Sequence, residues 1–273
     1  MKCIDRLVVN RWVIPIAFIF LPFVASATGQ AGDQLIYQGD TLSLHTNPLE
    51  QYFQGKASRS INGEVLSWTS TGCYRGYFAT WELVKDSLFL VSIQKGCQLQ
   101  DPEYYDLQAE FGKTRVFAQW YTGTLLVPQG NLIHYVHSGY ESFYESELEF
   151  TVARGQVTGQ QVYDNSRSYQ SVFTTNQDSL ATYLHTHTRW TQIPDLGSRT
   201  YTVYLGLQSG PYRSPDSVFL VRSTEIEAIN QEALRLIESL PGWDVYYRKG
   251  RVFPMKWMVP VRFSEALREK YGG

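Results

Sequence analysis

Two pairs of histidines are the residues whose type and spacing best fit metal chemistry. His185 and His187 are two residues apart, and His134 and His137 are three apart. On a β-strand, residues i and i+2 share a face, so His185 and His187 could bind one ion. A zinc site also needs a third or fourth ligand of fixed geometry, which the sequence does not identify. Solvated or core histidines are therefore the favoured interpretation.

Paired carboxylates offer a second kind of chemistry. Glu141 and Glu145 are four residues apart, and a glycosidase uses two carboxyl groups separated by a few ångströms. Acidic proteins contain many such pairs, so this one carries little weight. The chain has no Gly-Xaa-Ser-Xaa-Gly nucleophile elbow and no glycine-rich phosphate loop. We therefore expect no enzyme, no cofactor and no bound metal.

The composition of the chain argues against a nucleic-acid partner and favours an aromatic, β-rich core. Of 273 residues, 43% are hydrophobic and 18% are charged, as in ordinary packed proteins. The net charge of −2 argues against nucleic acid, because phosphate binding requires a basic face. Aromatic residues make up 15% of the chain, which favours a β-rich fold.

The first 27 residues have the features of a signal peptide. Lys2, Arg6 and Arg11 precede an apolar run at 12–24, and small residues at 25–27 suit cleavage by a signal peptidase. The run has about 13 residues, fewer than the roughly 20 that a membrane-spanning helix needs. We predict export to the periplasm, and secretion or anchoring in the inner membrane by an uncleaved segment are the alternatives.

Export would place the remaining cysteines in an oxidising compartment. Cys3 leaves with the signal peptide, so Cys73 and Cys97 remain as an even pair. Their midpoint falls in the turn between strand-like runs at 77–83 and 88–93. Residues equidistant from the turn of an antiparallel hairpin face each other at about 5 Å, which suits a disulfide. We predict a Cys73–Cys97 disulfide across one long hairpin, with a redox or metal role as the alternative.

The stretch 33–163 is predicted to form an antiparallel β-rich domain. Its clearest strand is 145–153, where Leu148, Phe150 and Val152 alternate with polar residues. Turn signals rich in glycine and asparagine separate neighbouring strands. The other predicted strands are 35–37, 41–44, 77–83, 88–93, 114–120, 123–126 and 132–136.

Residues 164–196 are predicted to be a linker or hinge that contains a short helix at 179–185, followed by a second domain at 197–265. The fold class is therefore α+β, an antiparallel β-rich domain followed by a small β-β-α-β domain. Apolar residues at helical spacing, with charged residues between them, mark the helix of this second domain. Its predicted elements in chain order are a strand at 200–207, a strand at 218–221, a helix at 228–240 and a strand at 252–263.

This second domain resembles the C-terminal domain of TonB, the periplasmic part of the machinery that pulls on outer-membrane receptors. Ala233 matches an alanine near the middle of that family's helix, and Trp243 matches the tryptophan that follows it. Residues 259–263, Val-Pro-Val-Arg-Phe, match a closing strand of Val-Pro-Ile-Xaa-Phe type. The resemblance at 197–263 covers about 65 of 273 residues. The loop at 209–216 departs from the family, which has an Asp-Gly turn there.

The resemblance implies a mode of binding. TonB-like domains present a strand edge to which a short receptor peptide adds as another strand. The expected partner is a protein of the cell envelope, either an outer-membrane receptor or a second copy of this chain in a homodimer. Because the side chains of the final strand alternate, core packing is the alternative role for each of them. The candidate partner-binding residues on this strand are Val252, Trp257, Val259, Val261 and Phe263.

A carbohydrate- or envelope-binding domain with no role in transport is the alternative function. Aromatic rings stack on sugar rings, and aromatics are dense at 104–105, 120–121 and 140–144. Core packing explains most aromatic residues in a β-rich fold, so a protein-interaction role is favoured. Three or more of these rings on one open face would favour sugars.

Overall fold

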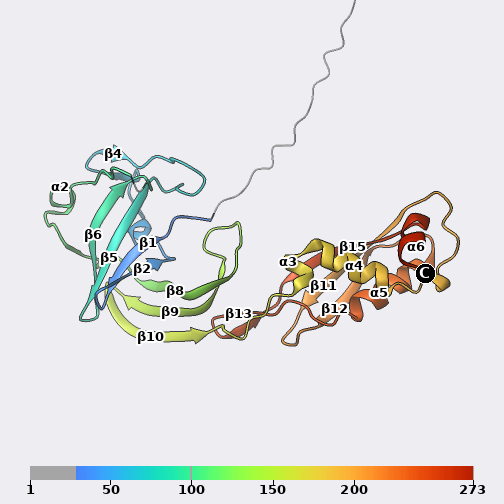
Figure 1. Ribbon diagram of the computed structural model, residues 1–273. Helices are drawn as coiled ribbons and strands as arrows, with labels where there is room; N and C mark the ends of the chain where they lie inside the picture. The colour runs from blue at the N-terminus through green and yellow to red at the C-terminus, as the bar shows by residue number, and fades with distance from the viewer. Residues whose placement is uncertain (1–28, 99, 273) are drawn as a thin grey trace, which may run out of the picture.

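The computed structural model describes residues 29–98 and 100–272, which form two lobes lying end to end (Figure 1). The fold is mixed α+β and rich in strands, as predicted. The predicted signal peptide at 1–27 lies outside the described residues. Within the described residues, no helix is long and apolar enough to cross a membrane.

The first lobe is built on one strongly curved sheet. The hydrogen-bonded order of its strands is β2 (Asp40–Leu44), β1 (Asp33–Tyr37), β5 (Tyr77–Val84), β6 (Ser87–Lys95), β10 (Gln156–Asp164), β9 (Phe143–Ala153) and β8 (Gly123–His134), and β7 (Val116–Phe117) also pairs with β6. The backbone N–H of His45 donates to the carbonyl of Leu126 at 2.8 Å, so the two ends of the sheet approach each other.

One strand pair departs from the predicted antiparallel arrangement. β1 and β5 are parallel, whereas the other pairs in this sheet are antiparallel. Parallel neighbours need a long crossover connection. This connection carries β2, α1 (Leu49–Tyr52), β3 (Ser60–Ile61) and β4 (Glu64–Val65).

The strand β9 alternates as its sequence predicts, with one exception. Leu148, Phe150 and Val152 are buried in the core of the first lobe. Glu147 belongs to the predicted solvent face but is only 4% exposed. It is covered because its carboxylate accepts a hydrogen bond from the backbone N–H of Lys249, which belongs to the second lobe, at 2.7 Å.

In the first lobe, three predicted strands were inexact and two elements were not predicted. The predicted strands 123–126 and 132–136 are parts of the single strand β8, and the predicted strand 114–120 is reduced to β7. β10 was not predicted, because most of its side chains are polar and exposed. The short helix α2 (Leu107–Phe111) was also missed, although Asp106 caps its start and Gly112 ends it with a φ of 70°.

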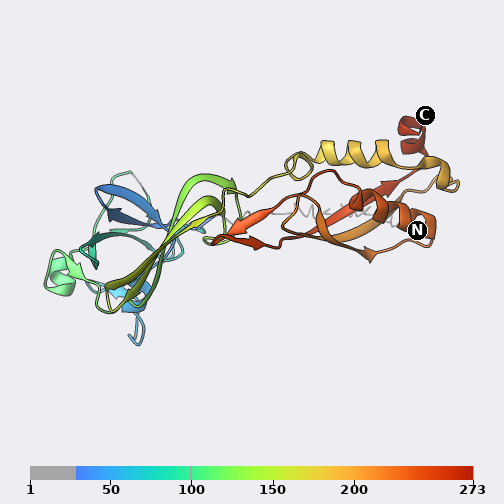
Figure 2. The same cartoon turned by 90° about the horizontal axis from the view of Figure 1, so that it is seen from below.

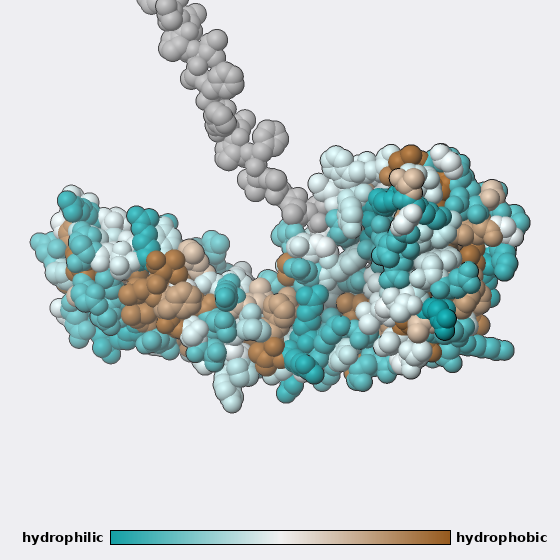
Figure 3. Space-filling view, turned by 180° about the vertical axis from the view of Figure 1, so that it is seen from behind, coloured by the Kyte–Doolittle hydropathy of each residue, from teal (hydrophilic) through white to brown (hydrophobic). Residues whose placement is uncertain are grey.

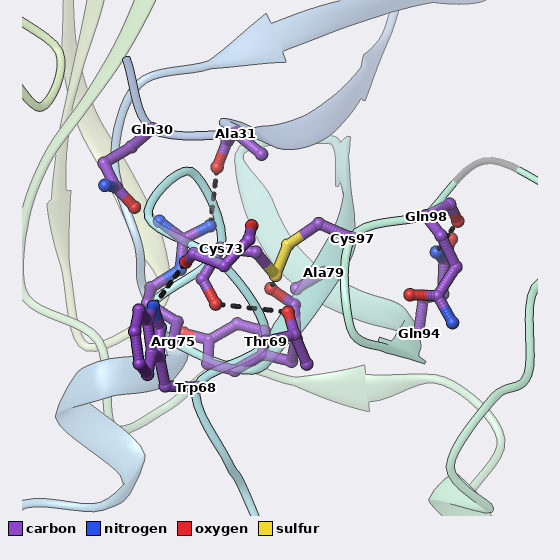
Figure 4. Close-up of a disulfide and its surroundings, with 12 residues drawn as sticks. Gln30, Ala31, Trp68, Thr69, Cys73, Arg75, Ala79, Gln94, Cys97 and Gln98 are labelled. Atoms are coloured by element: carbon purple, nitrogen blue, oxygen red, sulfur yellow. Dashed lines mark hydrogen bonds between the residues drawn. A yellow bond between two sulfur atoms is a disulfide. The ribbon is translucent and has the colours of Figure 1, made fainter. Parts of the chain in front are cut away.

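The disulfide between Cys73 and Cys97 is present, with Cα atoms 5.9 Å apart (Figure 4). It lies just beyond the paired residues of the hairpin β5–β6, whose ladder begins at Tyr77 and Lys95. Continued from this pair, the register would set Cys97 opposite residue 75, so the two cysteines are not direct cross-strand neighbours. The bond therefore closes the open end of the hairpin rather than bridging two strand residues.

The second lobe packs helices on one face of a small sheet (Figure 2). The strand order is β12 (Pro215–Arg222), β11 (Tyr201–Ser209) and β15 (Lys256–Phe263), all antiparallel. Val203, Leu205 and Val261 face the helices and are almost completely buried. The helices are α3 (Val172–Thr175), α4 (Gln177–His187), α5 (Glu227–Glu238) and α6 (Glu265–Tyr271), with a 3-10 turn at Trp190–Gln192.

The stretch 164–196, predicted to be a linker or hinge, is largely part of the second lobe. It contains α3 and α4, and it contributes Leu184, Trp190, Ile193 and Leu196 to the core beneath the sheet. These apolar residues are widely spaced among polar ones, which is why the sequence resembles a linker. The chain passes between the lobes closer to Asn165, where β10 ends.

A hairpin of the second lobe reaches back to the first. It consists of β13 (Tyr246–Arg248) and β14 (Arg251–Phe253). The backbone N–H of Gly250 donates to Asn165 Oδ1 at 2.9 Å, and Arg248 Nη2 donates to the carbonyl of Tyr140 at 3.0 Å. The predicted single strand at 252–263 is therefore divided, and Val252 lies in this hairpin rather than on the final strand.

Candidate functional site

The strand β15 has a free edge whose exposed backbone groups can be identified. The N–H of Ser209 donates to the carbonyl of Met255 at 2.8 Å, which sets the phase of the ladder between β11 and β15. Backbone groups alternate in direction along an antiparallel strand. The residues whose N–H and C=O face β11 are therefore Trp257, Val259, Val261 and Phe263. The residues whose groups face the free edge are Lys256, Met258, Pro260 and Arg262.

Pro260 agrees with this assignment. A proline has no N–H and is found within sheets where its nitrogen faces away from a neighbouring strand. Pro260 lies opposite Tyr204 of β11 and its side chain is exposed. The free edge of β15 therefore offers both a donor and an acceptor at Met258 and Arg262, but only an acceptor at Pro260.

The helix α4 runs alongside this edge (Figure 2). Side chains of the two elements line a groove of about 450 Å³. Leu180, Ala181 and Leu184 line its helical wall, while Trp257 and Val259 line the strand wall. Both walls are apolar at their centre. The groove thus combines unpaired backbone groups on one side with hydrophobic side-chain contacts on the other.

A side-chain cap begins α4, and contacts with α5 and the core hold α4 beside β15. Asn176 caps α4, and its side-chain oxygen accepts from the N–H groups of Asp178 and Ser179. At the other end, Arg235 of α5 donates to the carbonyl of His187 at 2.7 Å. Leu184 completes the attachment by packing into the core. The helical wall is therefore held at both ends.

The turn before α4 is tied to a buried carboxylate. Asp244 is fully buried and accepts hydrogen bonds from the N–H of Ser171 at 2.6 Å, from Thr174 Oγ1 at 2.7 Å and from the hydroxyl of Tyr246 at 2.9 Å. Because Asp244 immediately follows Trp243 at the base of the groove, this network holds α3 against the start of the β13–β14 hairpin.

The end of the groove near Arg262 is basic. Burial lowers the pKa of His185, and the charges of Lys270 and Arg262 lower it further, so His185 is neutral near pH 7. No carboxylate of the described residues lies within ion-pair distance of Arg262 or Lys270. Arg262 therefore brings to one end of the groove a positive charge that no carboxylate of the described residues pairs.

The structure divides the five predicted partner-binding residues between different positions. Val259, Val261 and Phe263 are at most 4% exposed, and they pack in the core of the second lobe. Trp257 is partly buried and lines the groove, where its ring meets Trp243 edge-on at 5.9 Å. Val252 lies apart on β14. Only Trp257 and Val259 among them line the groove.

The features that sequence reasoning missed are the position of the helical wall and the role of the alternate residues on β15. The short helix predicted at 179–185 is confirmed and is longer, as α4. Its place beside β15 was not predicted, because it lies in the stretch taken as a linker. Pro260 was noted only as part of a motif. Its place inside a strand already indicates an edge.

The histidine pairs lie apart and pack against aromatic rings. His185 and His187 are on α4 rather than on a strand, so they do not share a face. The ring of His187 stacks on Tyr183 with centroids 4.0 Å apart, and that of His134 lies 4.9 Å from Tyr246. Across the described residues, no group of three or more His, Cys, Asp or Glu side chains could hold a metal ion.

Of the two carboxylates considered for catalysis, Glu145 is occupied by hydrogen bonds from Asn131. Both oxygens of Glu145 accept hydrogen bonds from Asn131, one from its backbone N–H at 2.9 Å and one from its side-chain amide at 3.0 Å. These bonds lower the pKa of Glu145. Glu145 therefore stabilises the bend in β8, and Glu141 is exposed beside the turn that follows.

A buried ion pair in the first lobe is likewise occupied by protein groups. Asp33 and Arg75 are almost completely buried, with 3.2 Å between Oδ1 and Nη2. Burial raises the pKa of Asp33 to about 6, although the charge of Arg75 opposes this shift. Asp33 also accepts from the indole N–H of Trp81 and the backbone N–H of Ala79. The network joins β1 to β5 and opens into none of the cavities described for the chain.

The aromatic clusters considered for sugar binding are mostly covered. Tyr105 and Tyr121 are buried, and Trp120 stacks on Phe111 at the edge of the core. Tyr104 is 55% exposed. These clusters therefore do not present the open row of rings that a sugar platform needs.

The other face of the second sheet carries exposed apolar side chains, and Figure 3 shows hydrophobic surface gathered on this lobe. Phe219, Val221 and Met258 are each about half exposed or more. The ring of Phe219 lies over Gly206, where a Cβ atom would come within 2.5 Å of it. This face lies next to the free edge of β15 and shares Met258 with it.

The chain matches no protein-family model, no curated protein and no solved structure.

Proposed function

We propose that this chain is an exported protein-interaction protein that binds an extended segment of a cell-envelope protein by β-strand addition to β15. The observation that carries this proposal is the free edge of β15 beside the apolar wall of α4. Unpaired backbone groups at a strand edge supply affinity to an added strand, and pockets beside the edge supply selectivity. The protein acts without catalysis.

The opposite edge of the sheet provides a comparison. β12 is also unpaired on its outer side, where the backbone groups of Val218 and Leu220 face outward by the same alternation. The groove of the second lobe that α4 lines lies along β15, not along β12. β15 is therefore the edge at which backbone pairing and side-chain recognition can act together.

The resemblance to TonB C-terminal domains supports the envelope setting. The order of β11, β12, α5 and β15 follows the β-β-α-β pattern. Ala233 is fully buried within α5, and Trp243, just after it, is 1% exposed. The hairpin β13–β14 between α5 and β15 is an addition to this pattern. On this proposal the protein works in the periplasm, and its partner is an outer-membrane receptor or a related transport component.

A proline at an outward position of β15 tests strand addition. Met258→Pro removes an outward N–H and places ring atoms where an added strand would lie, while the ladder with β11 keeps its bonds. Leu220→Pro makes the same change at the outer edge of β12 and serves as the matched control. Val259 and Val261 are unsuitable for this test, because their N–H groups bond to β11.

The measurement is capture of envelope proteins from a solubilised extract by the immobilised chain, quantified by mass spectrometry. We expect Met258→Pro to retain about a tenth of the partner captured by the unmodified chain, since losing the bond and the fit is worth about 1.4 kcal/mol. Leu220→Pro should retain all of it. Equal capture by both variants, with circular dichroism unchanged, would show that the partner does not add to β15.

A further inference from the structure

The free edge of β15 restricts what can be added to it, and the following inference rests on the proposed function. Pro260 lies at the centre of the edge and lacks an N–H. Lys256 and Arg262, which are exposed, lie at its two ends. Prolines and cations on an edge strand are features that disfavour pairing with an identical strand.

Self-pairing meets an obstacle in the three two-fold registers centred on Val259, Pro260 and Val261. A two-fold pair of edge strands is antiparallel. Centred on Pro260, it sets each carbonyl against the proline nitrogen of the other copy, which has no hydrogen to donate. Centred on Val259, it sets Lys256 directly opposite Arg262 of the second copy, and like charges in opposite positions are destabilising. Centred on Val261, it extends past Phe263 to Ser264, which already caps α6. The edge is therefore suited to a different chain.

The charge at one end of the groove specifies that chain further. Arg262 lines the groove and has no carboxylate partner among the described residues, and His185 beside it is partly buried. A carboxylate opposite Arg262 would form a cross-strand ion pair of the kind that stabilises sheets. The same charge would repel a basic segment.

Strand geometry specifies the neighbouring positions. Side chains directly opposite each other in a sheet share a face. Residues opposite Val259 and Val261 would therefore point towards Leu180, Ala181 and Leu184 of α4, and they should be apolar. The residue opposite Pro260 would point to the other face of the sheet, as would the one opposite Arg262.

We infer that the groove between α4 and β15 binds an internal, extended segment of a different protein, with two apolar residues separated by one residue and an Asp or Glu next to them. The apolar residues lie opposite Val259 and Val261, and the acidic side chain lies opposite Arg262. The carboxylate that faces Arg262 belongs to a side chain of the bound segment, so the segment does not need to end in a free C-terminus.

The test uses the full chain and fluorescein-labelled peptides, with binding followed by fluorescence anisotropy. The probe is acetyl-Thr-Glu-Val-Thr-Val-Glu-Thr-amide, which presents the pattern in either strand direction. The comparison peptide replaces both glutamates with lysine. We expect the acidic peptide to bind about fivefold more tightly than the basic one, the size of one cross-strand ion pair.

Charge reversal at Arg262 should invert this preference. Arg262→Glu should favour the basic peptide by a similar factor. Arg222→Glu, at the end of β12, changes the net charge equally and is the matched control; it should leave the preference for the acidic peptide in place. In sedimentation velocity, we expect the unmodified chain and Met258→Pro to have the same oligomeric state, because the unmodified chain forms no dimer through the edge of β15.

The outcomes separate this inference from the proposed function. Equal binding of both peptides, lost in Met258→Pro, would overturn the acidic specificity and leave strand addition supported. Binding only of a peptide with a free C-terminal carboxylate would overturn the internal segment. A dimer abolished by Met258→Pro would overturn the different partner. Absence of binding by either peptide, together with capture unaffected by Met258→Pro, would overturn the proposed function as well.

Discussion

The imidazole of His45 lies at the junction of the two lobes. Its ring stacks on Tyr140 with centroids 4.8 Å apart. Burial lowers the pKa of His45 to about 4, and the positive charge of Arg248, from the second lobe, lowers it further. The folded protein therefore prefers the neutral ring, and protonation would place two positive charges next to each other.

This shift predicts a pH dependence with a definite sign. The unfolded chain binds a proton at His45 near pH 6.5, whereas the folded chain does so only near pH 4. The stabilising contribution of the neutral ring is therefore present above pH 6.5 and is lost as the pH falls to about 4. It amounts to about 3 kcal/mol of unfolding free energy.

His45→Phe keeps a stacked ring and removes the titration. Urea denaturation at a series of pH values should show that the free energy of unfolding of the variant, relative to the unmodified chain, rises by about 3 kcal/mol between pH 6.5 and 4. Other titrating groups are common to both proteins and cancel in the difference. A difference that stays constant across this range would contradict the shift.

At the level of elements, Pro260 sets the behaviour of the edge of β15. Pro260→Val restores an outward N–H, so a two-fold pair centred on residue 260 gains two backbone hydrogen bonds. In that register Met258 lies opposite Arg262, so no like charges meet. We expect the dimerisation constant to increase about tenfold or more, measured by sedimentation velocity.

A control for this change is Pro211→Val, which alters an exposed proline in the loop between β11 and β12. It should leave the oligomeric state as it is. If Pro260→Val leaves the chain as monomeric as the control does, the edge is closed to other strands by something besides the missing donor.

The sequence was informative where the side-chain pattern of an element reflects its own burial. β9 and β11 alternate between core and surface, and α5 carries an apolar stripe, so all three were predicted close to their observed bounds. β10 was missed because both its faces are polar. The disulfide was predicted because its cysteines flank a local hairpin.

The site itself was only half predictable. The edge strand was identified through its resemblance to a family motif, but the residues chosen on it face inward. Which backbone groups are free depends on the phase of the ladder with β11, and that phase is a long-range property. The partnership of α4 with β15 joins segments about 80 residues apart, which no local pattern records.

At the scale of the whole molecule, the lobes meet at the β13–β14 hairpin through polar contacts and through the rings of Phe143, Tyr246 and Phe253. Asn165, 1% exposed, accepts from the N–H of Gly250 and donates to Glu147. Glu147 in turn accepts from the N–H of Lys249. Each lobe has its own core, so these polar bonds, together with the aromatic contacts, hold the lobes in place.

Asn165→Ala should loosen this junction. It removes the acceptor of the N–H of Gly250, a partly buried residue, at a cost of about 1 kcal/mol. Small-angle X-ray scattering should show a larger radius of gyration, and proteolysis at the turn around Lys249 should be faster. Asn131→Ala removes an amide that bonds Glu145 within the first lobe and is the matched control. Identical scattering from both variants would show that the lobes are held by other contacts.

The walls of the groove come from opposite ends of the second lobe in the chain. Residues of α4 are synthesised before any strand of that lobe, and β15 is synthesised after the other described strands. The binding edge therefore comes into existence only when translation has passed Phe263. On the proposed function, a product that stops before β15 would keep the first lobe, with its disulfide, but would not compete for the partner.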